Sequence, residues 1–264
     1  FANAPVDLPL NVLLGKPPKM TRSFARVENQ QPALDLRHVE LDQAIERVLH
    51  FPAVASKQFL ITIGDRSITG MVATQPMIGP WQVPVADVAV TLAGYSTNVG
   101  EAFAMGERSP LALINPAAAA RMAVAEALTN LVSADIQSVE RTVLSANWMA
   151  AAGSNAEEQA LFDAVTAVGL EFCPALGIAI PVGKDSMSMS SRWQDNGVEK
   201  SVVSPLTLIV SAFAPVADAR LTSTPELQQV ADSVLVLLEL GPQRLGGSAL
   251  AQVYGQLGEH APDV

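Results

Sequence analysis

The run from Pro116 to Val132 is a strong helix signal that limits the folds open to this chain. Proline stands in its first turn, alanine and leucine fill its body, and Asn115 precedes it in the N-cap position. Before and after it lie two apolar runs of strand length, Val85–Leu92 and Pro205–Ala214. Because both runs are apolar on both faces, they predict buried strands. Mixed elements of this kind predict an α+β or mixed α/β sheet with helices on one side.

Other periodic stretches predict further elements. A spacing of three to four between apolar residues predicts a short amphipathic helix at Leu41–Leu49, and a longer helix is expected from Glu157 to Phe172. The strand patterns outside the two buried runs occupy residues 59–63, 68–72, 139–145, 178–181 and 233–239. The first two of these flank Gly64–Ser67 and therefore predict a hairpin. A polar loop and a last helix are expected at residues 183–191 and 246–258.

The order of these patterns divides the chain into three parts. Residues 1–34 are rich in proline and are interpreted as a linker or the tail of a preceding domain. Residues 35–215 carry most of the strands and helices and are expected to form one domain. The pattern then restarts, so residues 216–264 are interpreted as a connector and the beginning of a second α+β unit. Because the chain starts without methionine, it is expected to be an internal fragment of a longer polypeptide.

Composition narrows the classes of partner and compartment. With 26 acidic and 16 basic side chains the formal net charge is −10, so duplex nucleic acid and anionic membranes are not expected partners. Because the chain is acidic, binding of an anionic substrate would require a local positive group, such as a bound Mg²⁺ ion or a nest of backbone amides. The single cysteine, Cys173, cannot form an internal disulfide, which predicts a cytoplasmic protein with this thiol buried as a packing residue.

Several sharp catalytic motifs are absent from the sequence. No Gly-x-Gly-x-x-Gly follows a strand, and Gly183-Lys184 is followed by Asp185 instead of the serine or threonine of a phosphate-binding loop. The three histidines have no metal-ligand spacing, and no serine nucleophile elbow is present. The sequence therefore predicts neither a dinucleotide-binding site nor a Walker-type phosphate-binding loop.

Acidic and amide side chains provide the remaining candidate site. Asp87 lies in an apolar strand pattern, where an uncompensated carboxylate would be costly. Glu126 and Asn130 are four apart on the predicted helix and therefore face the same way. Such oxygen ligands suit Mg²⁺. The spacing alone leaves alternatives open, since Glu126 could be a solvated helix residue and Asn130 an end cap. Lys57 could contact phosphate or be an ordinary surface lysine.

Several long strings in this sequence resemble one enzyme family, the large single-chain phosphoribosylformylglycinamidine synthases. They occur in the family's order over nearly the whole chain. The strings are Gly79–Asp87, Gly100–Ala102 with Gly106–Arg108, Ala125–Asn130, Leu144–Met149, Cys173–Gly177 and Pro181–Met189. The resemblance implies an ATP-dependent ligase of purine biosynthesis, which converts formylglycinamide ribonucleotide to formylglycinamidine ribonucleotide with glutamine as the amide donor.

The resemblance also implies a fold and a position within the enzyme. The fold is that of the aminoimidazole ribonucleotide synthetase superfamily, and residues 35–215 are similar to the N-terminal barrel-half domain of the second of two synthetase copies. The rest of the same polypeptide would supply the partners, namely the first copy, the C-terminal domain and the glutaminase domain. Because the glutaminase residues are absent here, this chain is not expected to be active alone.

The resemblance finally implies an auxiliary nucleotide site. In the family this site holds ATP or ADP with Mg²⁺ and is thought to be structural. Its metal ligands match Asp87, Glu126 and Asn130, while Ala86 matches a backbone contact to the nucleotide and Lys57 falls near it. Alternatively, the chain contributes directly to the catalytic substrate cleft, through residues 183–188.

Overall fold

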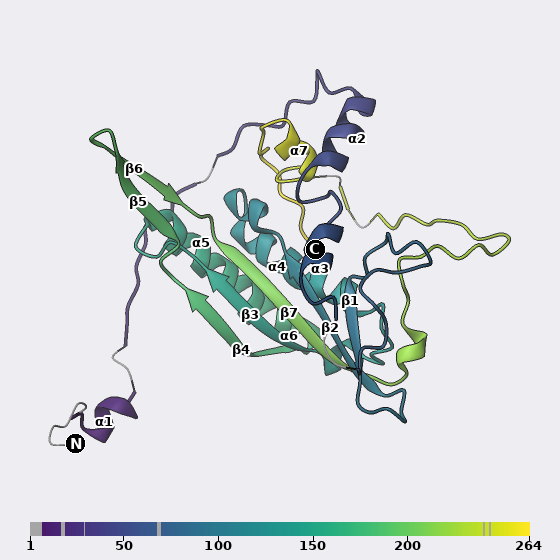
Figure 1. Cartoon of the computed structure of the whole chain (residues 1–264). Helices are drawn as coiled ribbons and strands as arrows, with labels where there is room; N and C mark the ends of the chain where they lie inside the picture. The colour runs from purple at the N-terminus through teal and green to yellow at the C-terminus, as the bar shows by residue number, and fades with distance from the viewer. Residues whose placement is uncertain (1–6, 17–18, 29, 68–69, 240, 243) are drawn as a thin grey trace.

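The centre of the structure is a five-stranded sheet with the strand order β1-β2-β7-β3-β4 (Figure 1). The structure is a computed structural model that describes residues 7–16, 19–28, 30–67, 70–239, 241–242 and 244–264. The strands of this sheet are β1 (Val88–Leu92), β2 (Gly100–Glu107), β3 (Val143–Met149), β4 (Ala179–Ser186) and β7 (Thr207–Val216). Neighbouring strands are antiparallel except β3 and β4, which run parallel. The mixed α/β sheet expected from the sequence is therefore confirmed.

Within the residues that the structure describes, helices cover one face of this sheet. Along β7, Val210 and Ala212 are buried and alternate with the half-buried Ser211 and the exposed Phe213. The same alternation occurs in β1 and β2. The positions of the two apolar strands were predicted correctly, but their burial on both faces was wrong. The reason is that the helices of this chain pack on one side, so every second side chain points to what we call the open face.

The helix α4 (Pro116–Leu131) lies on the covered face and packs against β2 and β7. The side chain of Asn115 accepts a hydrogen bond from the N–H of Ala118 at 3.0 Å, so the expected N-cap is confirmed. The buried side of α4 is built mainly from alanines, which lets its backbone approach the sheet closely. This helix carries two of the residues expected to bind metal.

Parallel neighbouring strands need a long crossover connection, and a second helical run provides it between β3 and β4. It consists of α5 (Asn155–Thr166), the π-helical turn η3 (Ala167–Phe172) and α6 (Cys173–Leu176), and it ends at Gly177 with φ of 69°. The run Asn155–Leu176 is long and apolar enough to cross a membrane by length and composition alone. However, it packs on α4 and buries Ala164 and Val168 in the core, so we interpret it as the outer helix layer.

A separate two-stranded sheet extends from one end of the main sheet (Figure 1). It is the hairpin of β5 (Ser190–Asp195) and β6 (Val198–Val203). Its turn residues Asn196 and Gly197 have φ of 52° and 79°, the positive values that a type I′ turn requires. The polar loop predicted at 183–191 was wrong, because β4 runs to Ser186 and the hairpin starts four residues later.

The hairpin predicted between residues 59 and 72 was also wrong. Its first strand is the helix α3 (Gln58–Ile63). Of the second, Ile68 and Thr69 lie outside the described residues, while Val72 forms an antiparallel bridge to Thr91 of β1. A short apolar run does not separate a strand from a helical turn by its periodicity, which explains the error.

Two predictions in the last fifty residues also changed. The described residues of the range 233–239 form no strand and are exposed. The expected last helix is shortened to α7 (Ala249–Val253), whose first turn is capped by Ser248 accepting from the N–H of Ala251 at 3.2 Å. The remaining short elements are α1 (Leu10–Leu13), η1 (Ser109–Leu113), η2 (Val139–Arg141) and η4 (Ala219–Leu221).

The predicted helix near residue 41 is confirmed as α2 (Leu41–His50), and it packs against α7 (Figure 1). The guanidinium of Arg47 lies over the ring of Tyr254, 4.8 Å from its centroid. Close by, the side chain of Gln256 accepts from the backbone N–H of Asp35 at 2.7 Å and donates to its carbonyl at 2.9 Å. Segments from before and after the sheet therefore meet in one cluster.

An extended segment near the start of the chain lies along α5. Asn155 accepts from the backbone N–H of Ala25 at 2.7 Å and donates to its carbonyl oxygen at 2.8 Å. Gln159, one turn later, holds the N–H and carbonyl of Val27 in the same way at 2.9 and 3.2 Å. We call residues 22–27 the strap, because two side-chain amides fix its main chain to the helix.

Candidate functional site

Two side chains of α4 hold the end of β2. The Nδ2 group of Asn130 donates to the carbonyl oxygen of Met105 at 3.0 Å. Glu126 Oε2 accepts from the backbone N–H of Glu107 at 2.7 Å. Since the two helix residues lie one turn apart, both reach the strand from the same side. The shared direction inferred from their spacing is therefore confirmed, and each has a main-chain partner that the sequence did not reveal.

Gly106 makes this close approach of strand and helix possible. A Cβ atom at this position would lie 2.1 Å from the carbonyl oxygen of Ala123 and 2.5 Å from the nitrogen of Ala127. Both contacts are far shorter than packing allows, so β2 lies directly against the backbone of α4. The glycine thereby brings the carboxylate and the amide of α4 to the strand end.

Glu126 also pairs with a cation that the sequence reasoning missed. Its Oε1 lies 2.7 Å from Nη2 of Arg108, the residue that follows β2. The pair is partly exposed, which limits its contribution to stability to about 1 kcal/mol or less. A metal ion bound to Glu126 would have to share the carboxylate with Arg108 or displace it. The sequence signal for this ion pair was the string Gly106–Arg108, because it places an arginine directly after the strand.

Asp87 lies at the same end of β2 but outside the strand pattern in which it was expected. β1 begins at Val88, and the preceding Asp87 is exposed, so the expected burial of this carboxylate was wrong. Val88 is paired with Ala104 in the antiparallel register. Asp87 and Met105 therefore lie one residue beyond this pair, at the same end of the two strands. That is also the strand end contacted by Asn130.

A small pocket has Ala86, the residue before Asp87, in its wall, whereas Asp87 itself is not part of the lining. The backbone N–H of Ala86 donates to the carbonyl of Pro76 at 2.9 Å, so this N–H already has a partner within the chain. The pocket has a volume of about 190 Å³. Its lining combines one cation with hydroxyl, amide and aliphatic groups, from Arg66, Ser67, Val72, Thr74, Gln75, Pro76, Ala86, Val88, Ala89, Val90 and Thr91.

Lys57 has a local partner in this structure. It immediately precedes α3, and its ammonium donates to the carbonyl oxygen of Ala55. This position differs from the strand entry that the sequence suggested, because α3 replaces the strand. The contact of Lys57 with a nucleotide stays a prediction.

Residues 183–188, the alternative cleft segment, lie at the other edge of the sheet. They belong to β4 and its end, whereas Asp87 adjoins β1 at the opposite edge. Three strands stand between, which at about 4.8 Å per strand separates the edge strands by about 19 Å. Within the segment, Nζ of Lys184 lies 2.5 Å from Oγ of Ser186. The structure thus separates this segment from Asp87.

Cys173 is buried, and burial raises the pKa of its thiol. It is therefore a packing residue, as expected, and not an activated nucleophile. In the part of the chain that the structure describes, no group of three or more histidine, cysteine, aspartate or glutamate side chains is close enough to hold a metal ion. The predicted set has two carboxylates and one amide, so it depends on additional oxygen ligands from phosphate or water.

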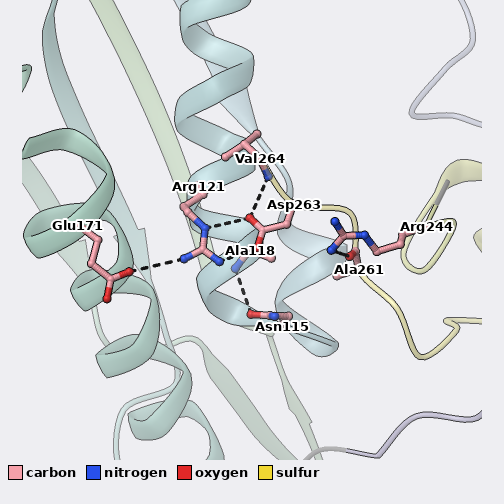
Figure 2. A network of polar contacts seen from close by, with 8 residues as sticks. All are labelled: Asn115, Ala118, Arg121, Glu171, Arg244, Ala261, Asp263 and Val264. Carbon is pink, nitrogen blue, oxygen red and sulfur yellow. Dashed lines mark hydrogen bonds and ion pairs between the residues drawn. The ribbon is translucent and has the colours of Figure 1, made fainter. Parts of the chain in front are cut away.

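A second polar cluster ties the end of the chain to α4 (Figure 2). Arg121 donates from Nε and Nη2 to the two carboxylate oxygens of Asp263 at 2.9 and 2.6 Å, with Glu171 at 3.9 Å. This hydrogen-bonded pairing lowers the pKa of Asp263 and raises that of Arg121. Because the guanidinium edge is filled by a carboxylate of the chain itself, we interpret this cluster as structural.

The oxygen atoms around the β2 end suit Mg²⁺. Among the described residues, the carboxylate of Asp87 and Oδ1 of Asn130 accept no hydrogen bond. Both are hard ligands of the type that Mg²⁺ takes together with phosphate oxygens and water. Glu126 is engaged by Arg108 and a backbone amide, yet a carboxylate offers about four lone-pair positions. The predicted ligands therefore fit the ion chemically.

Comparisons with known proteins bear on the family. The family model described as the FGAR-AT PurM_N-like domain matches residues 56–215. Among solved structures, the chain is similar to Thermotoga maritima PurL complexed with ADP, with a TM-score of 0.52 and 17% identity over 81% of this chain and 30% of that one. It is also similar to T. maritima PurL complexed with AMPPCP, with a TM-score of 0.50 and 16% identity over 85% of this chain and 32% of that one.

These matches differ in what they establish. At such low identity the likeness to the PurL structures shows a shared fold, and the chain spans about a third of the length of those proteins. The family match covers more than half of this chain and agrees with the resemblance read from its motifs. The chain therefore belongs to the FGAR-AT PurM_N-like domain family.

Proposed function

We propose that this chain is part of a formylglycinamide ribonucleotide amidotransferase, an ATP-dependent ligase of purine biosynthesis that takes its nitrogen from glutamine. The family match over residues 56–215 supports this assignment. The similar T. maritima PurL structures contain ADP or AMPPCP, which supports a nucleotide site in this fold. Because the chain spans about a third of those proteins, the complete reaction requires further parts of the polypeptide.

Within that enzyme, the chain supplies part of an auxiliary nucleotide and magnesium site. The observation that carries this proposal is the position of Asp87 and Asn130 at one end of β2: Asp87 lies across from Met105 in the strand register, and Asn130 donates to the Met105 carbonyl. Ala86, the residue before Asp87, lines the neighbouring pocket. Asp87, Glu126 and Asn130 would hold the Mg²⁺ ion, which would supply positive charge for the phosphate groups of ATP or ADP. Lys57 contributes a further cation to the nucleotide. The role is structural, and this chain alone has no synthetase activity.

The remaining parts of the same polypeptide are the proposed macromolecular partners. The open face supports this idea, because Phe103 and Phe213 stack there with their centroids 5.0 Å apart while both remain exposed. Exposed apolar patches of this kind are typical of interaction surfaces. We place the first synthetase copy against this face. The acidic charge gives no support to a nucleic-acid or membrane partner, and a cytoplasmic location follows from the pathway.

Metal binding by the 264-residue chain is the direct test. We expect the wild-type chain to bind Mn²⁺, used as a paramagnetic substitute for Mg²⁺, more tightly with ADP present. Asp87→Asn should weaken this binding at least tenfold, whereas Asp232→Asn, which removes an exposed loop carboxylate, should not. Equal binding by both variants, or no binding by the wild type, would contradict the proposed site.

Stability separates a structural role from a catalytic one in the complete enzyme. A nucleotide that binds only the folded state stabilises it by RT ln(1 + [L]/Kd), about 4 kcal/mol at a thousandfold excess over Kd. Asp87→Asn should therefore lower the melting temperature while the folded fraction keeps its turnover. If turnover collapses at unchanged stability, the alternative holds and this chain contributes to the catalytic cleft.

A further inference from the structure

Arg108 and Glu126 form an ion pair at the end of β2, beside the residues proposed to hold the metal ion. Nη2 of the arginine lies 2.7 Å from Oε1 of the glutamate. The other carboxylate oxygen, Oε2, accepts a hydrogen bond from the backbone N–H of Glu107 at 2.7 Å. Each oxygen of Glu126 therefore has a partner of its own, one on a side chain and one on the main chain.

These two partners differ in how easily they can leave the carboxylate. The N–H of Glu107 belongs to β2, and the close contact at Gly106 fixes this strand against the backbone of α4. The guanidinium of Arg108 is instead at the end of a long side chain that is 44% exposed. Exposed ion pairs are weak, because water solvates both charges. The arginine can thus withdraw from Oε1 while the amide keeps the carboxylate at the strand end.

Arg108 also has a contact that does not involve Glu126. Its Nη1 donates to the carbonyl oxygen of Glu107 at 3.3 Å. Because a guanidinium has several N–H donors, a movement away from Oε1 can keep this main-chain bond or replace it with water. The pairing of Arg121 with Asp263 is a contrast, since it consists of two hydrogen bonds between side chains that are both about one-fifth exposed. Of these two pairs, the one at Glu126 is built for exchange.

We propose that Arg108 competes with the metal ion for Glu126, as a positioning residue that holds this carboxylate until the ion is bound. The inference rests on the proposed function, because it concerns a ligand of the proposed site. Two positive charges at one carboxylate oxygen repel each other. Arg108 therefore withdraws from Oε1 when the ion is held there, while the N–H of Glu107 continues to orient the carboxylate through Oε2.

This competition has an effect opposite in sign to the loss of a ligand. Removal of Arg108 abolishes both the ion pair that must break and the repulsion between the two cations. Ion binding should therefore become tighter, whereas removal of a ligand such as Asp87 should make it weaker. The strength typical of exposed ion pairs corresponds to a change of about two- to fivefold in the dissociation constant.

Titration of the 264-residue chain with Mn²⁺ alone, followed by the paramagnetic resonance of the free ion, tests this inference. Arg108→Gln should bind Mn²⁺ about two- to fivefold more tightly than the wild type. Arg108→Lys keeps the charge and should stay near the wild-type affinity. The matched control Arg192→Gln removes one positive charge from the exposed hairpin and should leave the affinity unchanged. The control separates the loss of the local pair from the loss of net charge.

Two further measurements locate the effect at Glu126. In the Glu126→Gln variant, the added change Arg108→Gln should lose most of its effect on the Mn²⁺ affinity, because the ion pair is already gone. Modification by phenylglyoxal, followed by peptide mass spectrometry, should become faster at Arg108 when Mn²⁺ is added and stay unchanged at Arg192. A merely structural role of Arg108 would produce neither result.

The outcomes separate this inference from the proposed function. If Asp87→Asn weakens Mn²⁺ binding but Arg108→Gln binds the ion no more tightly than the wild type, the competition is refuted and the metal site stands. If Arg108→Gln strengthens binding through Glu126 while Asp87→Asn binds like the wild type, the competition stands and Asp87 is not a ligand. If neither the wild type nor Arg108→Gln binds Mn²⁺, the inference and the proposed site fail together.

Discussion

The covered and open faces of the five-stranded sheet are built from alternate residues of the same strands, yet they carry different side chains. On the covered face Ala104 and Ala212 are buried beneath α4. The preceding residue of β2, Phe103, and the following residue of β7, Phe213, point to the open face and are 36% and 44% exposed. Large apolar groups thus lie where no helix of the described segments covers them. The difference indicates a sheet completed on one side only, as expected of half of a barrel.

Leu144 and Phe213 test this contrast with the largest expected effect. Leu144 is fully buried on the covered face, so Leu144→Ala should lower the free energy of unfolding by about 3 to 4 kcal/mol through lost burial and a residual cavity. Phe213→Ala should cost about 1 kcal/mol in this chain, mainly from its stacking on Phe103. Urea denaturation monitored by circular dichroism measures both. Equal losses would show that the open face is a core in its own right.

Gly106→Ala tests how closely the covered face is packed. The added methyl group would meet the backbone of α4, so we expect a loss of about 2 to 3 kcal/mol in unfolding free energy. Gly169→Ala is the matched control, because nothing lies within 4 Å of a Cβ there and the change should be neutral or stabilising by up to about 1 kcal/mol. If Gly106→Ala is as well tolerated as its control, strand and helix are less closely packed than the structure indicates.

Asp263→Asn tests the ion pair that joins the last residues of the chain to α4, the helix on the covered face. The bond from Arg121 lowers the folded-state pKa of Asp263 below its ordinary value near 3.9. Its stabilisation is therefore fully present above about pH 4 and is lost as the pH falls through the lowered pKa. Asp263→Asn should destabilise the chain at pH 7, and its difference from the wild type should shrink toward pH 2. A difference that does not depend on pH would refute this pairing.

Glu157→Gln should show the opposite and smallest effect. Burial raises the pKa of Glu157 above its ordinary value near 4.3, and its Oε2 is buried without a partner among the described residues. The charged form therefore opposes folding at neutral pH, and this cost disappears as the pH falls below about 4. Glu157→Gln should be slightly more stable than the wild type at pH 7 and equal to it at pH 3. Thermal unfolding at the two pH values measures this, and a destabilised variant at pH 7 would contradict it.

The long periodic elements could be predicted from the sequence. The helix at Pro116 and its Asn115 cap followed from local signals, because both depend on neighbouring residues. The burial of the strands could not be predicted, since a strand apolar on both faces fits both a two-sided core and a one-sided sheet awaiting a partner. The dipeptide Asn196-Gly197 is a sequence signal for a hairpin turn, and it was not used in the prediction.

The candidate site was predicted in part. The common direction of Glu126 and Asn130 followed from helical spacing, but their strand contacts required the close approach at Gly106, which no local pattern reveals. The exposure of Asp87 depends on where β1 begins, and strand ends are set by pairing across the sheet. The buried and unpaired nitrogen atoms of Arg66 were not predicted, because both burial and hydrogen bonding depend on the assembled structure.

The strap has a practical consequence for where this protein is divided. Asn155 and Gln159 bind its main chain, while Arg22 and Arg26 form ion pairs with Glu158 and Asp163 of α5. A shortened piece that starts where the family match starts, at residue 56, would lose the strap and expose the surface around Phe162, on which Phe24 packs. A soluble version for biophysical work should therefore begin upstream of Arg22.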